Sequence, residues 1–223
     1  MKKHQISKAR EACKEKFLYY FPKGFRDAKY ISWERGYKWE AHMAWEAMLN
    51  KKEYERLLVN KDYIDIAIRA VRIETKTNLL FSFEKMALRD AIKETDGARI
   101  FSEGLYEYIY GKSSMKSRFE NFTEALEALP RKQTRVRTWP LQTVFGFIAC
   151  PKEHIFLKPR VTQNAAKKYD YDFYYSSHPN WETYESLFTF AQEIRMGMPD
   201  LKPVDFIDLQ SFIWVLGSEE YPD

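Results

Sequence analysis

The densest group of basic side chains lies between Arg131 and Arg137. This stretch also holds Lys132 and Arg135, and it leads into an apolar segment that begins at Trp139. Arginine donates paired hydrogen bonds to phosphate oxygens, and the free amides of a helix start also attract an anion. The segment therefore predicts contact with a phosphate group.

A second pair of bases, Lys158 and Arg160, stands ahead of Thr162, whose hydroxyl group is predicted to cap a helix. The six bases of the two stretches form the candidate surface for binding nucleic acid or another phosphate-bearing ligand. The alternative is that both stretches are solvated loops between helices, because short basic runs occur in many proteins that bind no phosphate.

Glu84 is the carboxylate with the most unusual predicted surroundings. It lies in the apolar segment 78–92, which is predicted to form a helix at the centre of the core. A buried carboxylate needs a partner or a shifted pKa, so we expect a structural ion pair with a base from another helix. A carboxylate-dependent hydrolase is the alternative, and it requires a second carboxylate or a base beside Glu84. The predicted buried face of this helix consists of Leu79, Phe83, Met86, Ala87 and Ala91.

Asp65, Glu74 and Lys76 follow the order of residues in metal-dependent nucleases, in which two carboxylates hold a cation and a lysine orients the attacking water. That chemistry requires paired strands. The apolar spacing of residues 66–73 is helical and contains no turn residue. We therefore interpret these charged residues as solvated helix ends.

The sequence predicts no metal site and no cofactor. Its four histidines are scattered, and His42 and Glu46 lack the further ligands that a metal site needs. The sequence also has no glycine-rich phosphate loop, nucleophile elbow or zinc-protease motif.

Charge is unevenly distributed along the chain. Residues 1–38 carry a net charge of +7 and residues 131–172 carry +6, whereas residues 173–223 carry −7. The basic segments either face an external polyanion, whose phosphates would dominate affinity, or face the protein's own acidic C-terminal segment. A second hypothesis for function is a protein-interaction or assembly module that uses exposed aromatic side chains of this C-terminal segment.

The composition is that of a globular protein, with 45% hydrophobic and 30% charged residues among 223. No apolar run is long enough to span a membrane, and Cys13 and Cys150 lie far apart, as is typical of reduced thiols in a cytoplasmic protein. Periodicity and capping residues predict a mainly α single domain over residues 1–223, with at most a small β-hairpin near 154–175. A possible seam at 130–140 separates a helical part, 1–130, from a mixed C-terminal part, 140–223.

Four sequence blocks resemble a group of bacterial proteins to which no function is assigned. The blocks are TNLLFSFEKMALRD at 77–90, FLKPRVT at 156–162, PNWETY at 179–184 and DLQSFIW at 208–214. The resemblance implies a bacterial cytosolic protein, but it implies no reaction, cofactor or catalytic residue.

Overall fold

Helices account for the regular structure of this chain. The computed structural model describes residues 2–130 and 136–223, and within these ranges it contains no β-strand. The prediction of a mainly α-helical fold is confirmed, and residues 154–175 hold helix α10 instead of a hairpin. The predicted seam at 130–140 includes residues 131–135, which lie outside the described ranges. The longer helices are α1 (Lys2–Tyr20), α3 (Gly36–Met48), α4 (Lys51–Val59), α5 (Tyr63–Glu74), α6 (Ser82–Ala91), α7 (Thr95–Tyr110), α8 (Met115–Ala128), α9 (Trp139–Ala149), α10 (Pro159–Lys168), α11 (Trp181–Gly197) and α12 (Phe206–Gly217), and the short ones are η1 (Gly24–Arg26), α2 (Ala28–Tyr30) and the π-helical η2 (Ile31–Arg35).

Local capping explains where several helices begin. The side chain of Asp27 accepts a hydrogen bond from the amide of Lys29, and Asp205 accepts from the amides of Ile207 and Asp208. Such short polar side chains satisfy amides that have no partner in the first turn. The predicted cap at Thr162 is wrong, because α10 begins at Pro159, a residue suited to the first helical turn.

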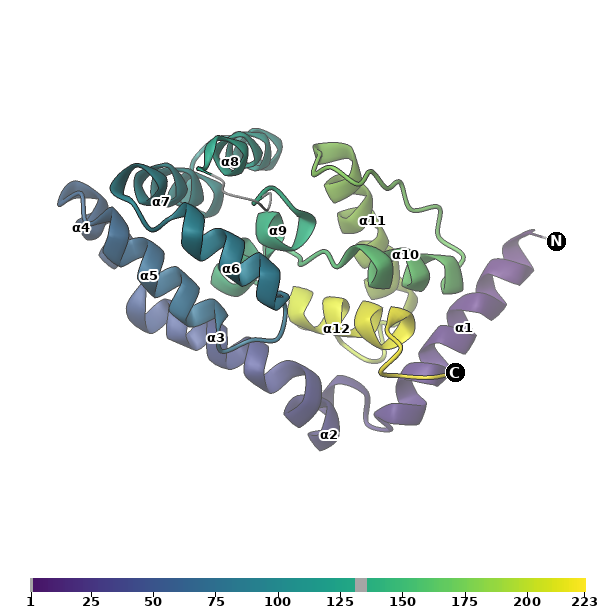
Figure 1. Cartoon of the computed structure of the whole chain (residues 1–223). Helices are drawn as coiled ribbons and strands as arrows, with labels where there is room; N and C mark the ends of the chain where they lie inside the picture. Colours follow the sequence, from purple (N-terminus) through teal and green to yellow (C-terminus); the bar gives the residue numbers. More distant parts are fainter. Residues whose placement is uncertain (1, 131–135) are drawn as a thin grey trace.

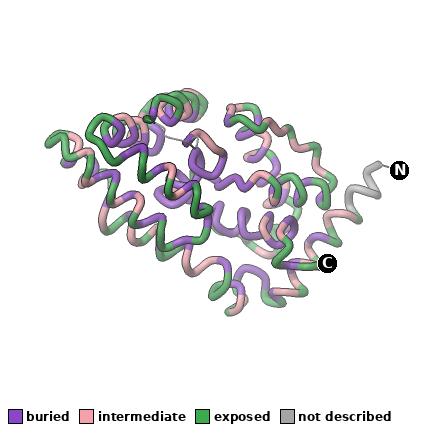
Figure 2. The backbone as a smooth tube through the Cα atoms, in the orientation of Figure 1, coloured by how far each residue is buried: buried purple, intermediate pink, exposed green. Residues whose placement is uncertain are grey.

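Two helices form the centre of the molecule. Every residue of α9 is buried, and α12 is buried except for the partly buried Trp214. α9 packs against α3, α5, α7 and α8, whereas α12 packs against α1, α10 and α11. Figure 1 shows this arrangement, and Figure 2 shows the buried residues concentrated in these two central helices.

The prediction that 78–92 lies at the centre of the core is wrong. Leu79 and Ala91 are buried as predicted, but Phe83 is 55% exposed and Met86 is 63% exposed. α6 starts later than predicted and lies on the surface, with one side against the molecule (Figure 1). Apolar residues all round a short helix do not distinguish a central helix from one that borders a pocket.

The segment before α10 is extended but pairs with no strand. Side chains satisfy two of its buried backbone amides. The amide of Leu157 donates to the hydroxyl oxygen of Thr143 at 3.1 Å, and the amide of Ile155 donates to the hydroxyl oxygen of Tyr184 at 3.3 Å. A buried segment needs such partners when no sheet supplies them. Among the described residues, no helix is both long enough and apolar enough to cross a membrane.

Candidate functional site

A pocket of about 670 Å³ lies where the starts of α6, α9 and α10 meet the end of α12. Its volume is typical of a site for a small ligand. Five aromatic side chains line it: Phe81, Phe83, Trp139, Tyr175 and Trp214. Among the described residues, its charged lining residues are Glu84, Arg137, Lys158, Arg160, Glu219 and Glu220. We refer to it as the aromatic–basic pocket.

Three helices begin at the wall of this pocket. The residues that precede their first turns all line it, namely Phe81 before α6, Thr138 before α9 and Lys158 before α10. Each helix start carries partial positive charge from amides without intrahelical partners. Thr138 caps α9 by accepting from the amide of Leu141, whereas no side chain in the described part of the chain caps α10. The pocket is therefore more favourable to an anion than its side-chain charges alone indicate.

Lys158 is held firmly in the pocket wall. It is only 8% exposed, and its Nζ donates a hydrogen bond to the carbonyl oxygen of Leu79 at 2.9 Å. The same atom lies 3.5 Å from the centre of the Phe81 ring. Burial lowers the pKa of the Lys158 amine, while the nearby carboxylates Glu84 and Glu74 act in the opposite direction. Lys158 therefore positions Phe81 through a cation–π contact and adds positive charge beside it.

The two arginines of the pocket differ in what they contact. Arg137 Nε lies 3.4 Å from a carboxylate oxygen of Glu127. Arg160 is exposed, in the first turn of α10, and forms no ion pair with any described residue. Arg160 is thus the guanidinium that an incoming anion reaches without breaking an existing pair.

The six bases predicted to bind phosphate can be placed in part. The structure brings Arg137, Lys158 and Arg160 together in the aromatic–basic pocket. Arg131, Lys132 and Arg135 lie outside the described residues. Two stretches that are separate in sequence therefore meet at one site.

Glu84 lines the same pocket, but its carboxylate is already engaged. It is 3% exposed, its Oε2 accepts from the backbone amide of Phe81 at 2.9 Å, and its Oε1 accepts from the hydroxyl group of Thr138 at 3.3 Å. The first contact is the glutamate half of a capping box, and the second links the starts of α6 and α9. Glu84 is buried as predicted, although on a surface helix, and its contacts assign it a structural role. The ion pair expected for it is absent from the described contacts.

The predicted role of Asp65 and Glu74 as solvated helix ends is half right. Both lie on α5, which is a helix as predicted, and Asp65 pairs with Arg69 at 2.7 Å on the surface. Glu74 is instead only 1% exposed and pairs with Lys85 at 3.3 Å. Burial raises the pKa of Glu74, and Lys85 opposes that shift. One helix cannot supply the paired-strand geometry of the nuclease pattern.

Acidic residues of the C-terminal segment pair with basic residues of the N-terminal segment. Arg10 pairs with Glu193, and Lys14 Nζ lies 3.0 Å from the carboxylate of Asp200. Further along, Lys16 and Arg35 contact other carboxylates of the same acidic segment. For residues 1–38, the structure thus supports the internal interpretation of the charge distribution over an external polyanion.

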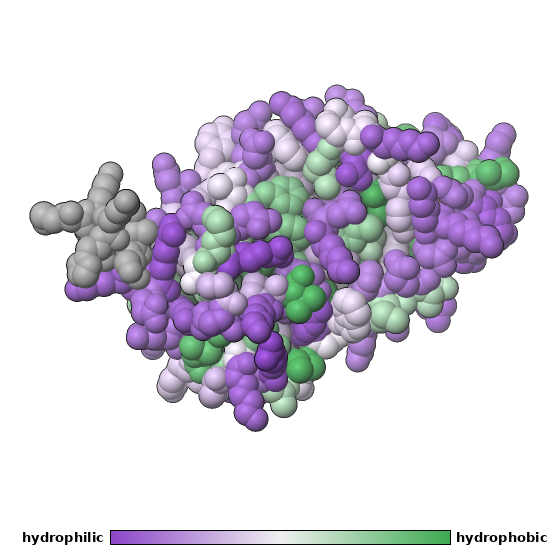
Figure 3. All heavy atoms as spheres, turned by 180° about the vertical axis from the view of Figure 1, so that it is seen from behind, coloured by the Kyte–Doolittle hydropathy of each residue, from purple (hydrophilic) through white to green (hydrophobic). Residues whose placement is uncertain are grey.

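The aromatic side chains of the C-terminal segment are largely packed inside. Tyr184 is fully buried, and Trp181, Phe188 and Trp214 pack against the core. Figure 3, which views the molecule from behind, shows separate hydrophobic areas among hydrophilic side chains. The protein-interaction hypothesis stays a prediction, with few exposed rings to support it.

The aromatic lining of the pocket was missed from the sequence. The apolar pattern predicts Phe83 to be buried in the core, and in the sequence Trp139 is distinguished only by its position after a basic run. Trp214 joins the pocket because α12 packs against α10, and Tyr175 lines it from the segment before α11, so both depend on tertiary structure. The one usable signal was that both basic stretches stand directly before helix starts.

No group of three or more metal-binding side chains occurs within residues 2–130 and 136–223. His42, considered as a ligand, instead forms a hydrogen bond of 2.9 Å with the carbonyl oxygen of Ile148. Comparison with protein-family models found no match, and searches of curated proteins and of solved structures found none either. The geometry of the pocket therefore carries the functional argument.

Proposed function

We propose that this chain is a non-enzymatic binding protein for a small ligand that carries a phosphate group and a flat ring, such as a nucleotide. The ligand occupies the aromatic–basic pocket. Its phosphate lies near Arg160 and the start of α10, and its ring lies against the aromatic wall.

The observation that carries this proposal is the convergence of three helix starts on one pocket that also holds an arginine without an ion pair to any residue that the structure describes. Phe81, Thr138 and Lys158 mark the three starts, and Arg160 is exposed beside them. Helix starts and guanidinium groups both favour phosphate, through backbone amides and through paired hydrogen bonds respectively. Glu84 and Thr138 already accept at the starts of α6 and α9, so the start of α10, which no described side chain caps, offers the strongest attraction to an anion.

The rings supply the second part of the recognition. Phe81 and Phe83 are each 55% exposed and stack on one another, with centres 5.7 Å apart and planes at 23°. Exposed phenyl rings beside a pocket gain from being covered by another flat apolar group. Stacking of this kind is tolerant of ring identity, so the purine of a nucleotide is one suitable occupant.

Negative charges at the pocket favour a single small phosphate compound over a long nucleic acid. Glu219 and Glu220 also line the pocket, and Glu220 accepts a hydrogen bond from Trp214 Nε1 at 3.0 Å. A protein binds a polyanion tightly when a continuous track of basic side chains neutralises successive phosphates. The two carboxylates interrupt such a track. Part of the N-terminal positive charge is also engaged in internal ion pairs.

Isothermal titration calorimetry with adenosine diphosphate, adenosine, inorganic phosphate and a short oligothymidylate tests the proposal. We expect adenosine diphosphate to bind at least about tenfold more tightly than adenosine or phosphate alone, because it reaches both halves of the pocket. Tightest binding by the oligothymidylate would assign the site to nucleic acid instead. Absence of binding by all four compounds would contradict the proposal.

A further inference from the structure

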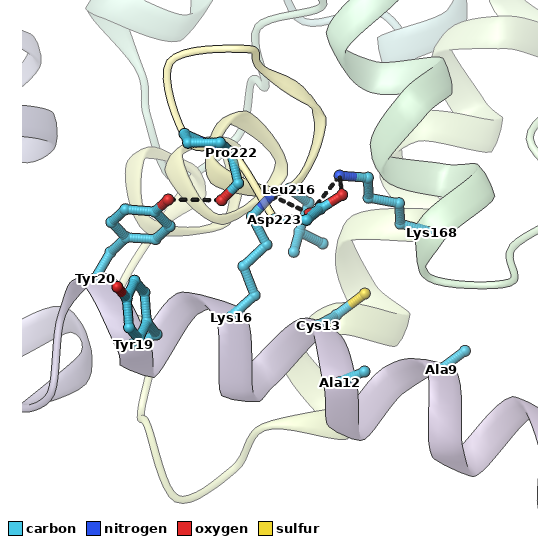
Figure 4. A pocket seen from close by; sticks show the side chains of 10 residues that line it. All are labelled: Ala9, Ala12, Cys13, Lys16, Tyr19, Tyr20, Lys168, Leu216, Pro222 and Asp223. Carbon is cyan, nitrogen blue, oxygen red and sulfur yellow. Dashed lines mark hydrogen bonds and ion pairs between the residues drawn. The ribbon is translucent and has the colours of Figure 1, made fainter.

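A second pocket, of about 750 Å³, lies between α1 and residues that follow α12 (Figure 4). It is separate from the aromatic–basic pocket, with which it shares no lining residue. Its charged lining residues are Lys16 of α1, Lys168 at the end of α10, and Asp223. We refer to it as the α1 pocket.

Two ammonium groups from different helices converge on one carboxylate in this pocket. Lys168 Nζ donates to both oxygens of Asp223 at 2.7 Å, and Lys16 Nζ donates to Oδ1 at 2.5 Å. These hydrogen bonds lower the pKa of Asp223 to about 2, so the carboxylate is an anion at neutral pH. Figure 4 shows Asp223 between the two lysines. The pair of lysines is therefore a preformed receptor for a carboxylate.

Apart from the hydroxyl groups of Tyr19 and Tyr20, the other lining side chains of the pocket are apolar or weakly polar. Ala9 and Ala12 leave room on α1 because their side chains are small, and Cys13 and Leu216 are nearly buried beside them. The hydrocarbon parts of such a surface favour an aliphatic chain. A carboxylate receptor next to an apolar wall has the two features that recognise a fatty acid.

We propose that the α1 pocket binds an aliphatic carboxylic acid of medium chain length. The acid's carboxylate replaces that of Asp223 between Lys16 and Lys168, and its chain covers Ala9, Ala12 and Leu216. Asp223 is an internal competitor for the same place. This site is independent of the proposed phosphate site.

The Asp223 side chain is held loosely enough to be displaced. It is 69% exposed, and exposed ion pairs stabilise a fold only weakly. The adjacent backbone is tied by one further contact, in which the Tyr20 hydroxyl group donates to the carbonyl oxygen of Pro222 at 2.6 Å. The carboxylate of Asp223 can leave the lysines while this contact stays in place.

Titration of the full chain with sodium octanoate tests the proposal. We expect Asp223→Asn to bind octanoate about tenfold more tightly than the unmodified chain, because the competing carboxylate is removed. Lys168→Gln is expected to weaken octanoate binding by about tenfold in either background. The matched control is Lys167→Gln, which removes an exposed lysine next in sequence that does not line this pocket. Octanol, which lacks the carboxylate, is expected not to bind.

Several results would overturn the proposal. The first two are no octanoate binding by Asp223→Asn, and equal affinity of octanoate for Asp223→Asn and the unmodified chain. The third is an equal effect of Lys168→Gln and Lys167→Gln on octanoate affinity. The fourth is binding of octanol as tight as that of octanoate. Lys168 is well exposed, and a thermal unfolding curve of each variant verifies that the chain is folded.

Discussion

Arg35 and Asp205, 170 positions apart in the sequence, are joined by two parallel hydrogen bonds: Nη1 donates to Oδ1 at 2.9 Å and Nη2 to Oδ2 at 2.7 Å. The same guanidinium group donates to Asp208 Oδ1 at 2.8 Å. Both aspartates are almost fully buried, with side-chain exposures of 2% and 1%. One cation therefore neutralises two buried carboxylates and ties the η2 segment to the start of α12.

Removing this cation is expected to destabilise the fold strongly. Arg35→Met leaves Asp205 and Asp208 buried without their counter-charge, which should lower the free energy of unfolding by about 3–5 kcal/mol. Urea denaturation measures the loss. The matched control, Arg99→Met, breaks the exposed pair with Glu103 and should cost less than about 1 kcal/mol. Equal losses in the two variants would contradict the structural role of Arg35.

His154 is expected to make stability fall in acid. It is fully buried, neither ring nitrogen has a hydrogen-bond partner among the described residues, and burial lowers its pKa from 6.5 to about 3. The unfolded chain therefore binds a proton that the folded chain excludes as the pH falls between these two values. The contribution of His154 is fully present above pH 6.5 and declines by about 1.4 kcal/mol per pH unit below it, until the folded-state pKa is reached.

The contribution of His154 is isolated by comparing the pH dependence of the free energy of unfolding of His154→Phe with that of the unmodified chain. The acidic groups titrate in both proteins, so their effect cancels. We expect the phenylalanine variant to show a shallower decline in the free energy of unfolding as the pH is lowered. His178→Gln, which changes an exposed histidine, should leave the decline unchanged. The loss of stability in acid is not due to His154 if both variants show the same decline with pH as the unmodified chain.

The two cysteines are expected to react slowly with thiol reagents. Burial raises the pKa of the Cys13 thiol to about 11 and that of the Cys150 thiol likewise to about 11. At pH 8 only about one thiol in a thousand is then ionised, and the thiolate is the reactive form. Labelling with iodoacetamide should be far slower in the folded chain than in urea. Equally fast labelling in both conditions would show that the thiols are not protected.

The exposed ring of Phe83 is expected to contribute to ligand binding and little to stability. If the aromatic–basic pocket binds a nucleotide, Phe83→Ala should weaken adenosine diphosphate binding by about tenfold, because one stacking contact is lost. The free energy of unfolding of the Phe83→Ala variant should differ from that of the unmodified chain by less than about 0.5 kcal/mol, as is usual for exposed positions. The matched control is Met86→Ala, an exposed apolar residue of the same helix that does not line the pocket. Identical affinities for the two variants would remove the aromatic wall from the site.

Helix positions were predictable where the signal is local. Asp27 and Asp205 each cap a helix, and a capping carboxylate interacts with amides only two or three residues away. The burial of α6 was not predictable, since Phe83 and Met86 are apolar and yet face a pocket or solvent. Which apolar face a short helix buries depends on its neighbours, and those come from distant parts of the sequence.

The candidate site was predictable only in part. Basic residues ahead of helix starts predict Arg137, Lys158 and Arg160 as site residues, and the structure brings these three together. The roles of the carboxylates were harder to infer. Glu84 faces two helix starts, and its contact with Thr138 joins residues 54 positions apart. No periodicity within one helix encodes such a contact.

The most direct measurement of phosphate binding at the aromatic–basic pocket compares the affinity of adenosine diphosphate for the unmodified chain, Arg160→Glu and Arg89→Glu. Arg89 is an exposed arginine of α6 that does not line this pocket. Calorimetry should show binding weakened by more than about tenfold in Arg160→Glu, because a charge-assisted contact becomes a repulsion, and little changed in Arg89→Glu. Equal affinity for all three proteins, or no binding to the unmodified chain, would contradict a phosphate site at Arg160.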